Sequence, residues 1–122
     1  MHPLIKIEPL DDIAQNYANA VFLLAWQGRQ LVGTGALICE QAAVGRLVRM
    51  SVDQGHRRQG IGTLLLEYLL EHARARGYRQ LVLETTQTWE EVITFYRRNG
   101  FNEVARRHGD AHFVRSLEDA KA

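Results

Sequence analysis

The chain has 122 residues, enough for one hydrophobic core and too few for two, so we expect a single domain over residues 1–122. Hydrophobic residues make up 46% of it and charged residues 24%, and the formal net charge of +1 provides no global field for nucleic acid. No apolar run approaches the ~20 residues of a membrane span, and the first residues lack the layout of a signal peptide. We therefore expect a cytoplasmic protein without a membrane partner.

The N-terminal residues predict a strand followed by a short helix. Residues 4–10 alternate between apolar and polar side chains and are closed by Pro9. Asp11 or Asp12 then provides an N-cap for a helix that runs to Ala18.

The next segment predicts a β-hairpin. Residues 21–27 and 30–40 are apolar runs separated by a turn at Gly28 and Arg29. The only cysteine, Cys39, lies in the second run, where we expect a buried and inert thiol.

The centre of the chain predicts a βαβ unit. A strand over residues 45–52 precedes a helix over residues 61–76, whose apolar residues recur at the spacing i, i+3, i+4, i+7. Gly77 is suited to the end of that helix, and residues 80–86 form the next strand. Such a crossover predicts that the two strands run parallel.

The last third of the chain predicts a helix and a second hairpin. Thr88 and Glu91 have the spacing of a capping box, and the helix ends before Gly100. Residues 101–107 and 111–117 flank a turn. The whole pattern predicts an α/β fold with one mixed sheet, antiparallel at both ends and parallel in the middle.

The loop between the predicted strand and helix of the βαβ unit has the features of an anion site. Backbone N–H groups and the helix dipole converge near Gly60, and Arg57 and Arg58 add charge that suits a diphosphate. Two familiar phosphate loops are excluded. The P-loop needs a lysine where Ile61 stands, and the dinucleotide fingerprint needs a third glycine where Leu65 stands.

The remaining match is a resemblance to the GNAT superfamily of acetyl-CoA-dependent N-acetyltransferases. Residues 57–62, RRQGIG, fit its signature [QR]-x-x-G-x-[GA], and residues 95–101, FYRRNGF, resemble its second motif. The strand QLVLETT at residues 80–86 lies between them in the family's order, and the resemblance extends from about Val21 to the C-terminus. It implies a GNAT-like mixed sheet with helices on both faces.

The resemblance also implies where acetyl-CoA, the acetyl donor, binds. The pantetheine arm would hydrogen-bond to the backbone of Met50, Ser51 and Val52. The diphosphate would lie on the loop and first helical turn, formed by Arg57, Arg58, Gln59, Gly60, Ile61, Gly62 and Thr63.

In this family the acetyl group passes directly from the thioester to an amine, of a small molecule or a protein. Tyr96 matches the tyrosine that protonates the departing thiolate, and the N–H of Val52 would polarise the carbonyl. Tyr96 also belongs to an apolar helical stripe with Trp89 and Val92, so a purely structural role stays open.

The general base is a separate question. Many family members carry a glutamate early in the fourth strand, where this chain has Arg46. Glu84, twelve residues before Tyr96, resembles the base of protein N-terminal acetyltransferases. A structural role for Glu84 at the sheet is the alternative.

The segment between the first two strands is shorter than in most relatives, which have two helices there. Only residues 11–20 remain for it, so the resemblance implies a shortened N-terminal helical region and a shallow pocket, or one completed by a second subunit in a homodimer. This shortening supports an alternative function, a GNAT-like module that binds acetyl-CoA without efficient transfer and serves regulation or partner binding.

The sequence argues against two further hypotheses, a nucleic-acid-binding function and a metal site. A nucleic-acid domain would use a group of arginines, but the net charge and the lack of interleaved aromatic residues argue against it. The group comprises Arg97, Arg98, Arg106 and Arg107. We expect no metal site, because a turn separates His108 from His112 and keeps them off one helix face.

Overall fold

The computed structural model describes residues 4–10, 20–57 and 59–118. Its elements in chain order are β1 (Ile5–Pro9), β2 (Val21–Gln27), β3 (Gln30–Gln41), β4 (Val44–Val52), the short 3-10 helix η1 (Gln54–His56), α2 (Ile61–Ala75), β5 (Gln80–Thr86), α3 (Glu90–Arg98), β6 (Asn102–Arg107) and β7 (Asp110–Ser116). None of the described helices has the length and apolar character needed to cross a bilayer.

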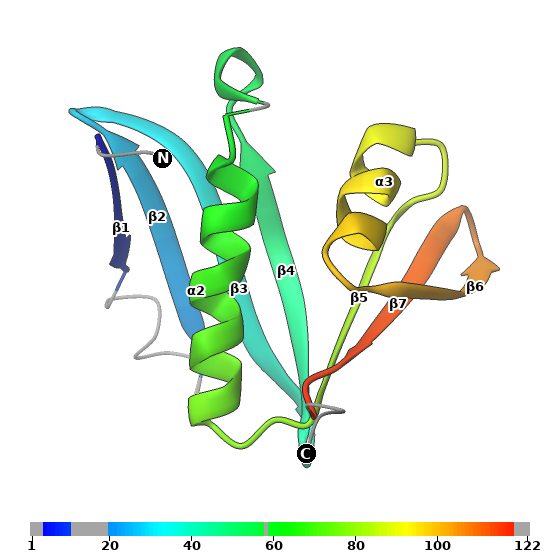
Figure 1. Ribbon diagram of the computed structural model, residues 1–122. Coiled ribbons are helices and arrows are strands. Elements are labelled where there is room, and N and C mark those ends of the chain that lie inside the picture. Colours follow the sequence, from blue (N-terminus) through cyan, green and yellow to red (C-terminus); the bar gives the residue numbers. More distant parts are fainter. Residues whose placement is uncertain (1–3, 11–19, 58, 119–122) are drawn as a thin grey trace.

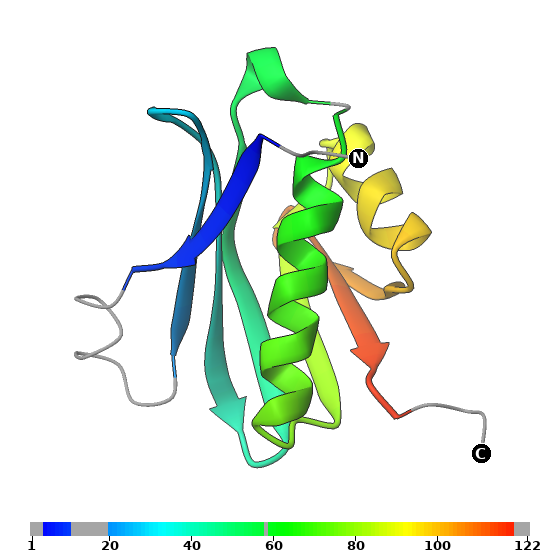
Figure 2. The same ribbon diagram turned by 60° about the vertical axis from the view of Figure 1, so that its left-hand side comes forward.

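The described strands form one seven-stranded sheet in the order β1-β2-β3-β4-β5-β7-β6 (Figure 1). Among these strands only β4 and β5 run parallel; every other neighbouring pair is antiparallel. This confirms the predicted mixed sheet. Helices α2 and α3 both lie on the same face of it (Figures 1 and 2), and the helix predicted from Asp11 or Asp12 to Ala18 falls outside the described residues.

The core lies between α2 and the sheet. Two glycines of β3, Gly33 and Gly35, face this helix, and a Cβ on either would come within 2.9 Å of a leucine Cδ1 of α2. The absence of side chains there lets Leu65 and Leu69 reach the sheet, where both are fully buried. Burying one such leucine contributes roughly 2 kcal/mol, so the leucines of α2 hold much of the fold together.

Most predicted boundaries agree with the structure to within one residue. Gly77 follows α2 with a φ of +80°, as expected of a residue that ends a helix in the left-handed region. The capping box is wrong: α3 begins at Glu90 with Trp89 as its N-cap and no side-chain cap. Glu90 and Glu91 instead occupy the first turn, where their charges complement the helix dipole.

The prediction of a buried thiol is also wrong, because Cys39 is exposed. The last three residues of β3 are exposed at the turn into β4, although the apolar run of the sequence continues to Cys39. Its Sγ lies 3.7 Å from the carbonyl oxygen of Gln41. The apolar run is therefore longer than the buried part of the strand.

Strands β4 and β5 pair over a short distance and then part (Figure 1). Their parallel register has three pairs, of which Arg46 with Val82 is the last. Beyond it, β4 contains a bulge at Arg49, whose φ is +57°, and the register against β3 shifts there. The hydroxyl of Thr34 donates a 2.8 Å hydrogen bond to the Arg49 carbonyl. Because a bulge bends its strand, it directs the end of β4 away from regular pairing.

We call the region where β4 and β5 separate the fork. The paired residues just before it depend on close packing at Gly45. A Cβ added there would lie 2.8 Å from Leu37 Cδ1 and 2.9 Å from side-chain carbons of Leu81 and Tyr78. We expect Gly45→Ala to lower the free energy of unfolding by roughly 1–3 kcal/mol through overpacking, measured by urea denaturation. Gly55→Ala, in η1, is the matched control, expected to change it by less than about 0.5 kcal/mol. Equal midpoints for the two variants would contradict the packing argument.

Candidate functional site

A cleft of about 1600 Å³ occupies the fork between β4 and β5. Its walls come from the diverging strands, from the loop after β4 and from the facing sides of α2 and α3. Figures 1 and 2 show these elements meeting at the same end of the sheet. The cleft therefore brings the end of β4 close to β5 and α3, although the whole of α2 lies between them in the sequence.

The predicted anion loop forms one end of this cleft. Gly60 is the N-cap of α2 with a φ of +81° and no side-chain cap, so the N–H groups of the first turn remain available to an anion. Ile61 is 1% exposed and anchors that turn in the core. A Cβ on Gly62 would lie 3.3 Å from the ring of Phe95, so glycine lets α2 and α3 approach each other.

The other loop residues differ in their positions. Arg57 is exposed, and its Nε donates a 3.2 Å hydrogen bond to the carbonyl oxygen of Val52. Gln59 is exposed, and Thr63 is half-buried at the cleft. Arg58 lies outside the described residues.

The end of β4 forms a wall of the cleft, and this wall includes Met50, Ser51 and Val52, the residues predicted to bind the pantetheine arm. Since strand pairing with β5 ends at Arg46, the side of β4 that faces β5 has no strand partner beyond that residue in the described chain. Its backbone groups from Leu47 onward border the cleft, where an extended ligand can hydrogen-bond to them as a strand would.

Tyr96 is both a core residue and part of the cleft wall. Its side chain is 5% exposed and packs edge-to-face on Phe95 and Phe101, with ring centroids 5.2 and 5.5 Å away. Burial raises the pKa of Tyr96 to about 12, so the hydroxyl keeps its proton at neutral pH. Trp89 is 58% exposed beside the cleft, so the predicted apolar stripe is not buried throughout.

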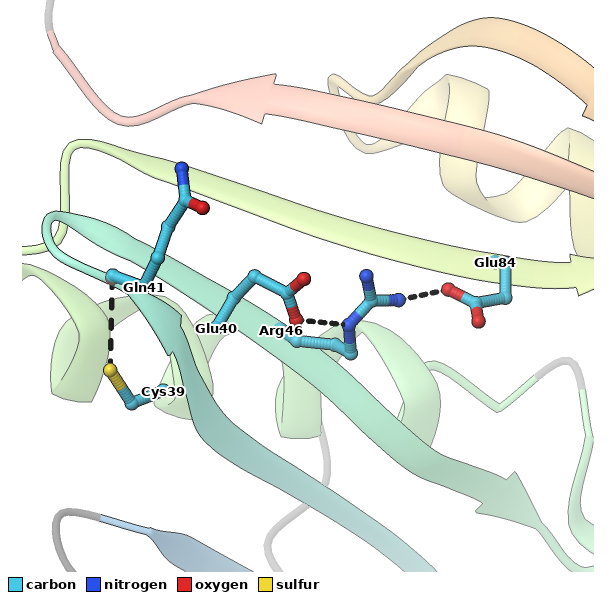
Figure 3. A network of polar contacts seen from close by, with 5 residues as sticks. All are labelled: Cys39, Glu40, Gln41, Arg46 and Glu84. Carbon is cyan, nitrogen blue, oxygen red and sulfur yellow. Dashed lines mark hydrogen bonds and ion pairs between the residues drawn. The ribbon is translucent and has the colours of Figure 1, made fainter.

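Glu84 lies at the cleft and is bound by an arginine. Its Oε1 accepts a hydrogen bond from Nη1 of Arg46, whose Nε donates to Oε1 of Glu40 at 2.7 Å (Figure 3). The hydrogen bond to Arg46 lowers the pKa of Glu40, and in return it raises the pKa of Arg46. Sequence reasoning treated Arg46 only as a missing glutamate and did not find this contact, because the register of β4 against β5 cannot be read from one sequence.

Acidic residues at the cleft also escaped prediction. Glu90, Glu91 and Asp110 line it near the end of β5 and the start of α3. The failed capping box of Thr88 and Glu91 was the only sequence signal for Glu91, and Glu90 had none. Among residues 4–10, 20–57 and 59–118, no three His, Cys, Asp or Glu side chains gather as they would around a metal ion.

The arginine cluster near the C-terminus is partly neutralised. Glu103 accepts hydrogen bonds from Arg97, at 2.6 Å, and from Arg106. The bond from Arg106 is the main cause of the lowered pKa of Glu103. Two of the four arginines considered for nucleic acid are thus already bound to one carboxylate.

Comparison with known proteins identifies relatives. Residues 18–103 match the family described as Acetyltransferase (GNAT) domain. N-acetyltransferase 8F1 of Rattus norvegicus is 38% identical over 103 residues, which cover 79% of this chain and 47% of that protein. The chain spans about half the length of the curated relatives it matches.

Solved structures share the fold. A GNAT-family acetyltransferase of Staphylococcus aureus Mu50 superposes with a TM-score of 0.80 at 27% identity, covering 88% of this chain and 75% of that one. The PaiA N-acetyltransferase of Thermoplasma acidophilum, solved in complex with coenzyme A, has a TM-score of 0.79 at 21% identity, covering 84% and 64%.

The raised pKa of Tyr96 predicts a loss of stability at high pH. Between pH 10.0, its ordinary pKa, and about 12, the folded protein keeps a proton that the unfolded chain releases. The free energy of unfolding therefore falls as pH rises through this window, by up to roughly 3 kcal/mol. We expect Tyr96→Phe to lack this component in urea denaturation at a series of pH values.

Wild type and Tyr96→Phe share every other group that titrates at high pH, so the difference between the two proteins isolates Tyr96. Tyr78, whose pKa is also raised by burial, contributes equally to both proteins. The same decline of stability with pH in both would show that Tyr96 ionises as an ordinary tyrosine.

Proposed function

The chain belongs to the GNAT acetyltransferase family, and we propose on that basis that it transfers the acetyl group of acetyl-CoA directly to a primary amine. The observation that carries this proposal is the fork of β4 and β5, with the uncapped first turn of α2 at its open end. The relative solved with coenzyme A adds support, because it has the same fold.

The diphosphate of the coenzyme is expected at Gly60 and the first turn of α2. Uncapped N–H groups and the positive end of the helix dipole favour an anion there, and a positive φ at the N-cap is accessible to glycine at little cost. Arg57 lies beside this turn and adds a positive charge. The pantetheine arm would then follow the unpaired side of β4 past Val52, Ser51 and Met50.

Acetyl transfer requires three groups from the protein. The amine must lose a proton before it attacks, since a lysine amine has a pKa of ~10.4 and an α-amine one near ~8. Glu84 is the candidate base for that proton, and the N–H of Val52 is the candidate donor to the thioester carbonyl oxygen. As the C–N bond forms and the C–S bond breaks, Tyr96 supplies a proton to the departing thiolate, and the proton that the new amide nitrogen releases restores the Tyr96 hydroxyl.

The protonated state of the Tyr96 hydroxyl supports its role as the proton donor. A hydroxyl with a pKa of about 12 keeps its proton at neutral pH and can donate it there. Its aromatic neighbours hold the ring in one orientation against the cleft. The acceptor amine would belong to a small molecule or to a protein.

Binding of the donor is tested by thermal unfolding. Acetyl-CoA at ~100 times its dissociation constant is expected to add ~2.7 kcal/mol of stability and to raise the Tm. Arg57→Ala is expected to weaken binding about tenfold through loss of a charged contact. Arg29→Ala, an exposed arginine in the turn between β2 and β3, is the matched control and should bind normally. An unchanged Tm with both acetyl-CoA and coenzyme A would end the proposal, including its non-catalytic form.

Catalysis is tested with Tyr96→Phe, which keeps the ring and removes the hydroxyl. Because a general acid contributes typically ~10²–10⁴-fold, we expect kcat to fall by roughly 100-fold or more. The KM for acetyl-CoA should stay the same. Release of coenzyme A across a panel of amines provides the measurement.

Two outcomes would revise the mechanism. Equal kcat values for wild type and Tyr96→Phe would remove Tyr96 from it. Coenzyme binding without turnover by wild type on any amine would favour the alternative of a regulatory acetyl-CoA-binding module.

A further inference from the structure

Arg46 lies at the point where β4 and β5 separate. It forms the last parallel pair with Val82, and Glu84 is two residues further along β5. Side chains alternate between the faces of a strand, so Glu84 and Val82 share a face. Arg46 and Glu84 are therefore the first polar residues of this face at the opening of the fork.

Three adjacent strands contribute one side chain each to this cluster, which we call the fork triad: Glu40, Arg46 and Glu84. Ile38 pairs with Arg46 across β3 and β4, and the register shifts between Cys39 and Gln41, where Glu40 lies. The hydrogen bonds of Arg46 to Glu40 and Glu84 bring the three side chains together (Figure 3). The face that Arg46 and Glu84 share is opposite to α2, whose leucines pack on the other side of β3.

The guanidinium of Arg46 is held from two sides. Its Nε donates to Glu40 and its Nη1 to Glu84, so the planar group lies between two carboxylates from neighbouring strands (Figure 3). A planar guanidinium bound at two of its nitrogens has little rotational freedom. The carboxylate of Glu84 is thereby held in one place.

The two carboxylates differ in what else they reach. Glu84 lines the cleft, whereas Glu40 does not. Arg46 binds Oε1 of Glu84, and within the described residues no hydrogen bond or ion pair involves Oε2. Oε2 is thus the atom of the triad that can receive a proton from a group in the cleft.

Stability alone is a weak reason for such an arrangement. The side chains of Arg46, Glu40 and Glu84 are 25%, 38% and 42% exposed. Ion pairs with this much contact to water contribute little to folding. A fixed orientation at the cleft is what the triad provides.

We propose that Arg46 is a positioning residue, which holds the carboxylate of Glu84 at the fork to receive the amine proton, while Glu40 holds Arg46. This inference rests on the proposed function, in which Glu84 is the base. It assigns a role to Arg46, which occupies the position where many family members carry a glutamate.

The experiment compares kcat and KM for one acceptor amine across variants of the full chain. Arg46→Met removes the contact to Glu84, and a displaced base is expected to lower kcat by roughly 10- to 100-fold with the KM for acetyl-CoA unchanged. Arg46→Lys should recover only part of this loss, because an ammonium lacks the planar two-point contact. Glu40→Gln should lower kcat less than Arg46→Met.

A double variant separates positioning from an independent effect. If Arg46 acts through Glu84, then Arg46→Met combined with Glu84→Gln is no slower than Glu84→Gln alone. Arg79→Met is the matched control, since Arg79 forms an exposed ion pair with Glu118 away from the cleft. We expect it to keep wild-type kcat and KM.

The outcomes distinguish this inference from the function on which it rests. Full activity in Arg46→Met, or additive losses in the double variant, would overturn the positioning role while leaving Glu84 as the base. Full activity in Glu84→Gln would overturn both the positioning role of Arg46 and the role of Glu84 as the base. If Arg46→Met does not fold, Arg46→Lys and Glu40→Gln decide, and wild-type kcat in both would overturn the proposal.

Discussion

The separation of β4 from β5 after three residue pairs is the constraint on which the rest of the site depends. A parallel pair that continued would fill the space with backbone hydrogen bonds and leave no cleft. The bulge at Arg49 places a non-glycine residue at positive φ within β4, and Thr34 stabilises it through the Arg49 carbonyl. This local irregularity makes one side of a central strand accessible, which a regular sheet offers only at its outer edges.

Glycine then allows the helices to close around that opening. Gly33 and Gly35 let α2 lie close to β3, and Gly62 lets α2 approach Phe95 of α3. The same helix presents an uncapped first turn after Gly60, so one element provides both part of the hydrophobic core and the proposed anion site. A shift of the α2 axis would therefore disturb the core and move the proposed anion site at the same time.

The two candidate catalytic side chains are held in different ways. Tyr96 is oriented by aromatic rings on three sides, an apolar setting that raises its pKa and keeps it a proton donor. Glu84 is oriented by the charge and geometry of Arg46, on the face of the sheet away from α2. The candidate acid is thus held by packing and the candidate base by an ion pair.

The sequence by itself determined the elements and their order, and it located the loop proposed to bind an anion, because hydrophobic periodicity and glycine placement are local properties. It also pointed to Tyr96 and Glu84, through motif and spacing. Only the tertiary structure decided that Cys39 is exposed, that α3 begins after Trp89 without a side-chain cap and that Arg46 binds Glu84. These depend on how far the sheet is covered and on the register between strands that are joined by a helix, and neither quantity is encoded within a local window of residues.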